Sequence, residues 1–166
     1  MKTFIVAVSG LIVVAALIAC APHAAVAQGP APSPSGYSVK HTDAEWRRIL
    51  SPEAYDVLRH AGTEAPFTSN LLTEHRKGTF ECAGCGQRLF DSSTKFESGT
   101  GWPSFWRPLK DVVIEKPDHS LGMDRIEVLC ARCGGHLGHV FDDGPKPTGL
   151  RYCMNGVALK FAPAKN

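Results

Sequence analysis

The spacing of apolar residues between positions 42 and 62 predicts two short helices. Thr42-Asp43-Ala44-Glu45 has the form of a capping box, in which a threonine and a glutamate three residues later cap the first backbone N–H groups. A second start follows at Ser51-Pro52-Glu53, where a serine cap precedes a first-turn proline. Apolar residues follow each start at helical spacing: Trp46, Ile49 and Leu50, then Tyr55, Val57 and Leu58. We expect the second helix to end near Gly62.

Beyond residue 77 the pattern changes to short β-type runs that are separated by Gly, Pro and Asp. The six runs are 79–81, 88–90, 112–114, 125–129, 139–141 and 159–161. Short runs joined by turns are typical of antiparallel strands. The pattern therefore predicts a mainly β domain with short helices at its start.

The first 27 residues have the composition of a secretory signal. Residues 4–19 are apolar or small, and this run is shorter than the roughly 20 residues that a bilayer span requires. Two processing sites compete. Residues 17–20 resemble a bacterial lipobox with Cys20 as the acylated residue, whereas Ala25-Val26-Ala27 is an ordinary A-x-A cleavage site. We predict a signal peptide over 1–27, or one ending at 19 if the lipobox is used.

Residues 28–36 contain three prolines and no apolar periodicity, which favours an extended, solvated tether. We therefore predict a flexible Pro/Ser/Gly linker over 28–40 and one folded domain over 41–163. With the leader, this organisation predicts an exported protein. It would be periplasmic, or a lipoprotein anchored to the membrane through Cys20 and facing the periplasm.

Four of the six cysteines form two CxxC pairs, Cys82 with Cys85 and Cys130 with Cys133. Two intervening residues allow both thiolates of a pair to bind one tetrahedral ion, so the pairs predict one closed, structural Zn²⁺ site per chain. In an exported chain the same cysteines could instead form two disulfides. We favour zinc because bound metal shields the thiolates from oxidation.

Paired CxxC motifs also occur in zinc-ribbon modules that bind nucleic acid. The near-neutral balance of 18 Lys and Arg against 16 Asp and Glu opposes that class, as do the leader and the additional cysteine downstream of the pairs, Cys153. We expect no nucleic-acid partner. A β domain that binds a ligand without performing chemistry is a further alternative, although such a domain would be expected to lack a cysteine at position 153.

Five motifs, in order along the chain, resemble the methionine sulfoxide reductase B family. They are Cys82-Ala-Gly-Cys85, Gly99-Thr-Gly-Trp-Pro-Ser-Phe105, Cys130-Ala-Arg-Cys133, Gly135-His-Leu-Gly-His-Val-Phe-Asp-Asp-Gly-Pro145 and Thr148-Gly-Leu-Arg-Tyr-Cys-Met-Asn155. The resemblance implies the family's fold, a sandwich- or barrel-like pair of antiparallel β-sheets, with zinc bound away from the active site. It also implies thiol-dependent reduction of methionine R-sulfoxide, free or in proteins. Protein repair and defence against oxidative stress would follow.

Sulfoxide reduction requires a soft nucleophile for sulfur, a proton for oxygen and an apolar slot for the methyl group. Cys153 can supply the nucleophile and end as a sulfenic acid. His136 and His139 can present donors to the oxygen, and Asn155 can fix a substrate or water. The resemblance places catalytic roles on these four residues. Structural alternatives are an inert core thiol and a hydrogen-bonding histidine pair in a glycine-rich turn.

Three further residues are candidates for binding the substrate. Trp102 could close over the methyl group as an aromatic wall, with Phe141 as a second contact, although both could also be core aromatics. Arg151 carries a positive charge that favours the Cys153 thiolate. No organic cofactor is expected.

Two positions depart from the family pattern. Many members carry a cysteine where Thr100 stands, and that cysteine resolves the oxidised nucleophile as a disulfide. Thr100 cannot do so, and the other cysteines are predicted zinc ligands or Cys20. We therefore expect oxidised Cys153 to await an external thiol, supplied by a thioredoxin-like protein or a small-molecule reductant. The second departure is Gly156, where a serine is more usual.

Overall fold

The computed structural model describes residues 36–165. The predicted signal peptide, with its lipobox and A-x-A site, lies outside these residues, as does most of the predicted linker. No helix in the described range is long and apolar enough to cross a bilayer.

Both predicted helices are confirmed. Helix α1 (Asp43–Ile49) begins with the capping box, in which the Glu45 carboxylate accepts the Thr42 backbone N–H at 2.8 Å. Helix α2 (Pro52–His60) is capped by Ser51 at its start and ends close to the predicted position near Gly62. Its C-cap residue, Ala61, has the left-handed conformation (φ 55°). Helix α2 packs its buried residues against the larger of two sheets.

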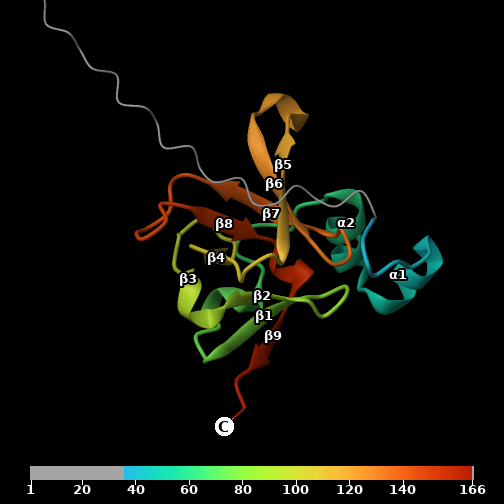
Figure 1. The fold of residues 1–166 in the computed structure, drawn as a ribbon, viewed down its shortest axis with the longest axis horizontal. Coiled ribbons are helices and arrows are strands. Elements are labelled where there is room, and N and C mark those ends of the chain that lie inside the picture. Colours follow the sequence, from blue (N-terminus) through green and yellow to red (C-terminus); the bar gives the residue numbers. More distant parts are fainter. Residues whose placement is uncertain (1–35, 166) are drawn as a thin grey trace, which may run out of the picture. The chain divides into compact units, whose positions relative to one another are not determined.

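The remainder of the described chain forms two antiparallel sheets joined by short 3₁₀ turns (Figure 1). The smaller sheet has the order β2-β1-β9, and the larger has the order β3-β4-β8-β7-β6-β5. The strands are β1 (Gly78–Cys82), β2 (Arg88–Asp91), β3 (Lys95–Phe96), β4 (Ser104–Phe105), β5 (Val113–Asp118), β6 (Arg125–Cys130), β7 (His136–Phe141), β8 (Arg151–Met154) and β9 (Leu159–Pro163). This arrangement confirms the mainly β fold with two antiparallel sheets.

The six predicted runs coincide with or overlap strands, but three strands carried no recognisable pattern. Strands β3 and β4 have only two residues each, and β8 has four, which is too short to display an alternation. Strand β7 starts at His136 rather than at the predicted His139. The two histidines therefore lie on a strand rather than in a glycine-rich turn.

Aromatic residues from both sheets meet in the core. Phe105 of the larger sheet stacks on Phe90 of the smaller one, with ring centroids 4.3 Å apart, and contacts Phe80 edge-on at 4.9 Å. All three rings are fully buried. Tyr152 and Met154 of β8 are buried as well. Because side chains alternate along a strand, Arg151 and Cys153 face the opposite side of the larger sheet.

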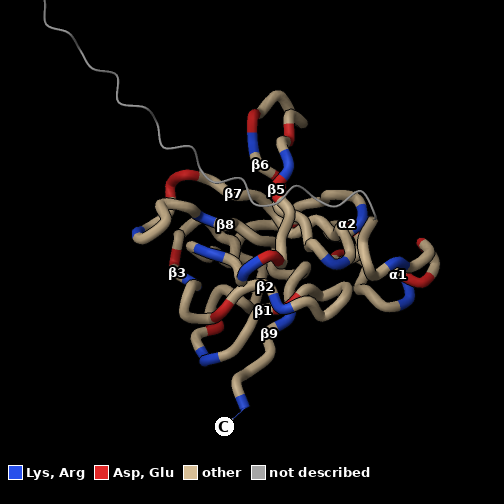
Figure 2. The backbone as a smooth tube through the Cα atoms, in the orientation of Figure 1, with Lys and Arg blue, Asp and Glu red and all other residues tan. Residues whose placement is uncertain are grey.

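Charged residues of both signs are interspersed along the described backbone (Figure 2). This distribution accords with the near-neutral composition. The absence of a nucleic-acid partner stays a prediction.

Candidate functional site

The pairing of β8 with its two neighbours fixes what surrounds Cys153. Cys153 lies opposite His139 of β7 and opposite Ser104 of β4, and Arg151 lies opposite Phe141. Residues directly opposite one another in antiparallel strands project to the same face. One face of the larger sheet thus carries Cys153, Arg151, His139 and Phe141 together.

Gly138 permits the close approach of β7 and β8. A Cβ atom at this buried position would lie 2.1 Å from the carbonyl oxygen of Cys153 and 3.0 Å from Cα of Met154. Its φ of 156° is also unfavourable for a residue with a side chain. The identity of residue 138 therefore controls where the backbone of Cys153 lies.

A bulge in β7 brings the two histidines to the same side. The pairing register shifts so that Val128 faces Gly138 while the next residue of β6, Leu129, faces His136. In a regular strand, residues three apart point to opposite faces, but the extra residue restores a common side. The ring centroids of His136 and His139 are 5.3 Å apart.

Each histidine is paired with a carboxylate from the neighbouring hairpin. Nδ1 of His136 lies 2.7 Å from Oε1 of Glu127, and Nε2 of His139 lies 2.9 Å from Oδ2 of Asp118. Burial lowers the pKa of His136, although Glu127 opposes that shift. A neutral His136 that donates its Nδ1 proton to Glu127 carries a lone pair on Nε2. That Nε2 is buried and has no protein partner among the described residues, so it can bind a substrate or a water.

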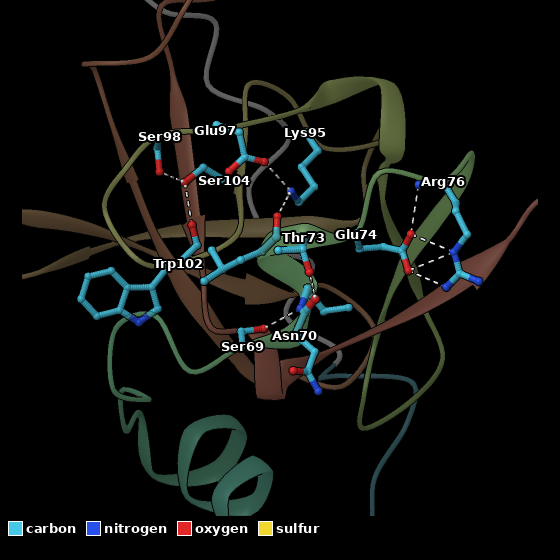
Figure 3. Close-up of polar contacts among 12 residues, drawn as sticks. Ser69, Asn70, Thr73, Glu74, Arg76, Lys95, Glu97, Ser98, Trp102 and Ser104 are labelled. Atoms are coloured by element: carbon cyan, nitrogen blue, oxygen red, sulfur yellow. Dashed lines mark hydrogen bonds and ion pairs between the residues drawn. The ribbon is translucent and has the colours of Figure 1, made fainter.

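Cys153 is half-buried, and its surroundings act on its pKa in opposite directions. Burial is the largest influence and holds the pKa of Cys153 above its ordinary value, while the Thr100 hydroxyl and the charge of Arg151 oppose that rise. The Thr100 hydroxyl oxygen lies 3.9 Å from Sγ and 2.8 Å from the Ser98 hydroxyl. Ser104 donates to Ser98 at 2.7 Å, as Figure 3 shows. The hydroxyls of Ser104, Ser98 and Thr100 therefore form a chain of polar contacts that ends at the Cys153 thiol.

Arg151 is held in place by a carboxylate from the turn that follows β7. Asp143 accepts two hydrogen bonds from the Arg151 guanidinium, both at 2.8 Å. The guanidinium also lies over the Phe141 ring, 4.4 Å from its centroid. Asp143 thus fixes the charge near Cys153.

Trp102 lies in the loop that precedes β4, and this loop is attached to β8. The Met154 backbone N–H donates to the Pro103 carbonyl at 2.9 Å, and the Trp102 indole N–H donates to the Glu64 carbonyl at 3.1 Å. The half-buried indole borders a cavity of about 150 Å³, which Phe67 and Leu72 also line. Cys153 is not among the residues that line it.

Both ends of the buried Asn155 amide are engaged with backbone groups. The Nδ2 group donates to the Leu137 carbonyl at 3.2 Å, and Oδ1 accepts the Glu64 N–H at 3.0 Å. One amide hydrogen is left for another partner. The Asn155 side chain therefore connects Leu137 of β7 to Glu64, whose carbonyl also accepts the Trp102 indole N–H.

The four CxxC cysteines come together in one cluster, built from the turns that follow β1 and β6. Their sulfur atoms all lie within 4.8 Å of one another, with Cys82 to Cys133 at 3.8 Å and Cys85 to Cys130 at 3.6 Å. A tetrahedral ion with metal–sulfur bonds of about 2.3 Å requires sulfur–sulfur edges of about 3.8 Å. A disulfide would need about 2.05 Å, and all four thiols are free. The cluster can hold one metal ion.

Sequence reasoning missed the residues that orient the site. Glu127 and Asp118 come from the β5–β6 hairpin, Asp143 from the turn after β7, and Glu64 from the segment after α2. None of them stands in a motif with the residue it contacts. Only strand register and tertiary packing bring them together.

Comparison with known proteins identifies the family. A family model described as the SelR domain matches residues 50–163. Proteins named peptide methionine sulfoxide reductase MsrB are similar to most of the chain. The one from Leptospira interrogans is 57% identical over 126 residues, which is 75% of this chain and 96% of that protein. The one from Methanosarcina barkeri is 58% identical over 125 residues, which is 75% and 88% of the two chains. Matches of this length and identity, over the residues that build the site, mean that the chain belongs to the methionine sulfoxide reductase B family.

Proposed function

We propose that this protein reduces methionine R-sulfoxide, free or in proteins, with Cys153 as the nucleophile. Membership of the family makes it an oxidoreductase, a peptide-methionine (R)-S-oxide reductase. The observation that supports the role of Cys153 is its surroundings. It is the one cysteine of the described residues outside the metal cluster, and it lies opposite His139 and beside Arg151.

The proposed first step transfers oxygen from substrate to enzyme. The Cys153 thiolate attacks the sulfoxide sulfur and a proton is delivered to the oxygen. The oxygen then bonds to the Cys153 sulfur as its bond to the substrate sulfur and the transient sulfur–sulfur bond break, and methionine leaves. The sulfoxide gains two electrons, and Cys153 is oxidised to a sulfenic acid. His139, which lies opposite Cys153, is the proposed proton donor, and His136 is proposed to present a water, held at its buried Nε2, to the same oxygen. Asn155 is the proposed polar contact, with Trp102 and Phe141 as the apolar ones.

The proposed second step regenerates the thiol. An external thiol attacks the sulfenic acid, releases water and forms a mixed disulfide, and a second thiol then frees Cys153. Thr100, at 3.9 Å from Sγ, occupies the place from which a resolving cysteine would act. The reductant in this scheme is a thioredoxin-like protein or a small thiol, and repair of oxidised proteins is the proposed physiological role.

The proposed metal is Zn²⁺, held by Cys82, Cys85, Cys130 and Cys133. Four soft sulfur ligands leave no open coordination position, so the ion would stabilise the fold and take no part in the reaction. The proposed location is outside the cytoplasm, either periplasmic or anchored at Cys20. The apolar run over residues 4–19 supports export.

The experiment that tests this function compares the two sulfoxide epimers as substrates. Wild-type protein with dithiothreitol should reduce the R epimer only, because a chiral slot accepts one hand. Cys153→Ser should abolish reduction and retain both the metal content and the far-ultraviolet circular dichroism of wild type. Without reductant, one methionine per enzyme should form, together with a dimedone-reactive Cys153. Equal reduction of both epimers, or an active Cys153→Ser variant, would refute the proposal.

A further inference from the structure

Glu64, in the segment between α2 and the first 3₁₀ turn, contacts two separate parts of the site through its main chain. Its N–H donates to Oδ1 of Asn155 at 3.0 Å, and its carbonyl accepts the Trp102 indole N–H at 3.1 Å. Asn155 follows β8, whereas Trp102 precedes β4. A single peptide segment thus fixes the orientation of two residues that come from different loops.

The Glu64 side chain anchors this segment to the chain that follows Asn155. Its carboxylate accepts hydrogen bonds from the backbone N–H groups of Gly156 and Val157, the latter at 3.0 Å. These are the first two residues of the 3₁₀ turn Gly156–Ala158. Hydrogen bonds from N–H groups to a carboxylate are about twice as strong as those between neutral groups. Among the described residues, Glu64 has no cationic partner, so these N–H groups are its main stabilising contacts.

Two further residues of this segment, Phe67 and Ser69, lie against the loops that carry Trp102 and Gly156. The Phe67 N–H donates to the Gly101 carbonyl at 2.8 Å, which attaches the segment to the Trp102 loop a second time. A Cβ atom on Gly156 would lie 1.9 Å from the Ser69 hydroxyl oxygen. Ser69 therefore fills the space that a serine at position 156 would need, which explains the glycine there.

We propose that Glu64 is a positioning residue for the reaction, whose carboxylate fixes the segment that orients the Trp102 indole and the Asn155 amide. This inference rests on the proposed function for its kinetic consequence, but its structural consequence can be measured without turnover. Removal of the carboxylate frees the two N–H groups and releases the Glu64 main chain. The indole and the amide then lose their fixed orientation, and displacements of about 1 Å in a catalytic site can lower rates by about 100-fold.

The test compares Glu64→Ala and Glu64→Gln with a control variant at Glu74. Glu74 belongs to the same part of the chain and likewise accepts a backbone N–H, from Arg76 at 3.0 Å. Figure 3 shows Glu74 and Arg76 directed at each other and away from the Trp102 indole. Glu74→Ala therefore removes a comparable carboxylate without affecting the site.

Kinetics and one spectrum decide the outcome. For Glu64→Ala we expect kcat/KM to fall at least about tenfold, with part of the loss in KM, while Glu64→Gln stays within about threefold because its amide oxygen still accepts one N–H. Glu74→Ala should stay within about twofold of wild type. The ¹H–¹⁵N spectrum has three indole signals, from Trp46, Trp102 and Trp106, and only that of Trp102 should move in Glu64→Ala.

The two readouts separate this inference from the proposed function. If the Trp102 signal does not move in Glu64→Ala, and kcat/KM of this variant equals that of Glu74→Ala, the positioning role is overturned. Glu64 would then only cap the 3₁₀ turn Gly156–Ala158. Inactive wild-type protein would refute the proposed function, while the indole signal would still report whether Glu64 positions Trp102. If Glu64→Ala does not fold, Glu64→Gln and Glu64→Asp supply the same comparison, because the shorter aspartate should reach one N–H group at most.

Discussion

Gly138→Ala should displace the nucleophile through its backbone. The added Cβ atom would lie 2.1 Å from the Cys153 carbonyl oxygen, a distance that real Cβ atoms essentially never show. Strands β7 and β8 would have to separate by about 1 Å to restore an ordinary contact. Because Gly138 is buried between neighbouring strands, no flexible side chain is available to absorb the change.

The cost has three parts. Overpacking in a close-packed region costs about 1–3 kcal/mol, an unfavourable backbone conformation about 1–3 kcal/mol, and each weakened ladder hydrogen bond about 1 kcal/mol. We expect the free energy of unfolding to fall by about 3–5 kcal/mol and kcat/KM by about 100-fold, since Cys153 moves with its backbone. Urea denaturation and kinetics with the R epimer measure the two effects.

Gly149→Ala is the matched control. Gly149 also has a positive φ, 74°, but a Cβ atom there would meet no atom within 4 Å. This variant should lose about 1–2 kcal/mol from backbone strain alone and retain wild-type kcat/KM. If Gly138→Ala instead matched Gly149→Ala in stability and activity, the spacing of β7 and β8 would not be what positions Cys153.

Four further predictions concern the cysteines and their neighbours. Cys133→Ser should lower both the bound metal and the melting temperature, because the cluster ties together two turns distant in sequence; a full equivalent of metal by elemental analysis would contradict it. Arg151→Met should raise the pKa of Cys153, since the guanidinium charge lowers it, so the alkylation rate by iodoacetamide should fall at neutral pH and its midpoint should move to higher pH. Thr100→Cys should form a disulfide with Cys153 after one turnover, detectable by peptide mapping, and change the preferred reductant. If Cys20 is the acylated lipobox cysteine, Cys20→Ser should release the protein from the membrane fraction, whereas an unacylated wild-type chain that begins at Gln28 would favour the A-x-A site.

The sequence by itself determined the features that depend on near neighbours. The caps at Thr42 and Ser51 act within one turn of helix, so the starts of α1 and α2 could be read directly. The CxxC spacing identified the cluster of four cysteines because two ligands of each pair come from one tight turn. The longer strands were recognised because short runs of β-type residues are separated there by Gly, Pro and Asp.

Only the tertiary structure decided how the site is assembled. The common side of His136 and His139 depends on a bulge that is defined by pairing with β6, and β8 is too short to carry a pattern of its own. The carboxylates that act on the two histidines and on Arg151 are brought there by strand register and by a turn, and Glu64 acts across about ninety residues. Such contacts join residues whose separation in sequence is set by loop lengths, and no local propensity encodes them. Local chemistry therefore specified most of the elements and the four-cysteine cluster, whereas long-range pairing specified the orientation of Cys153 and its neighbours.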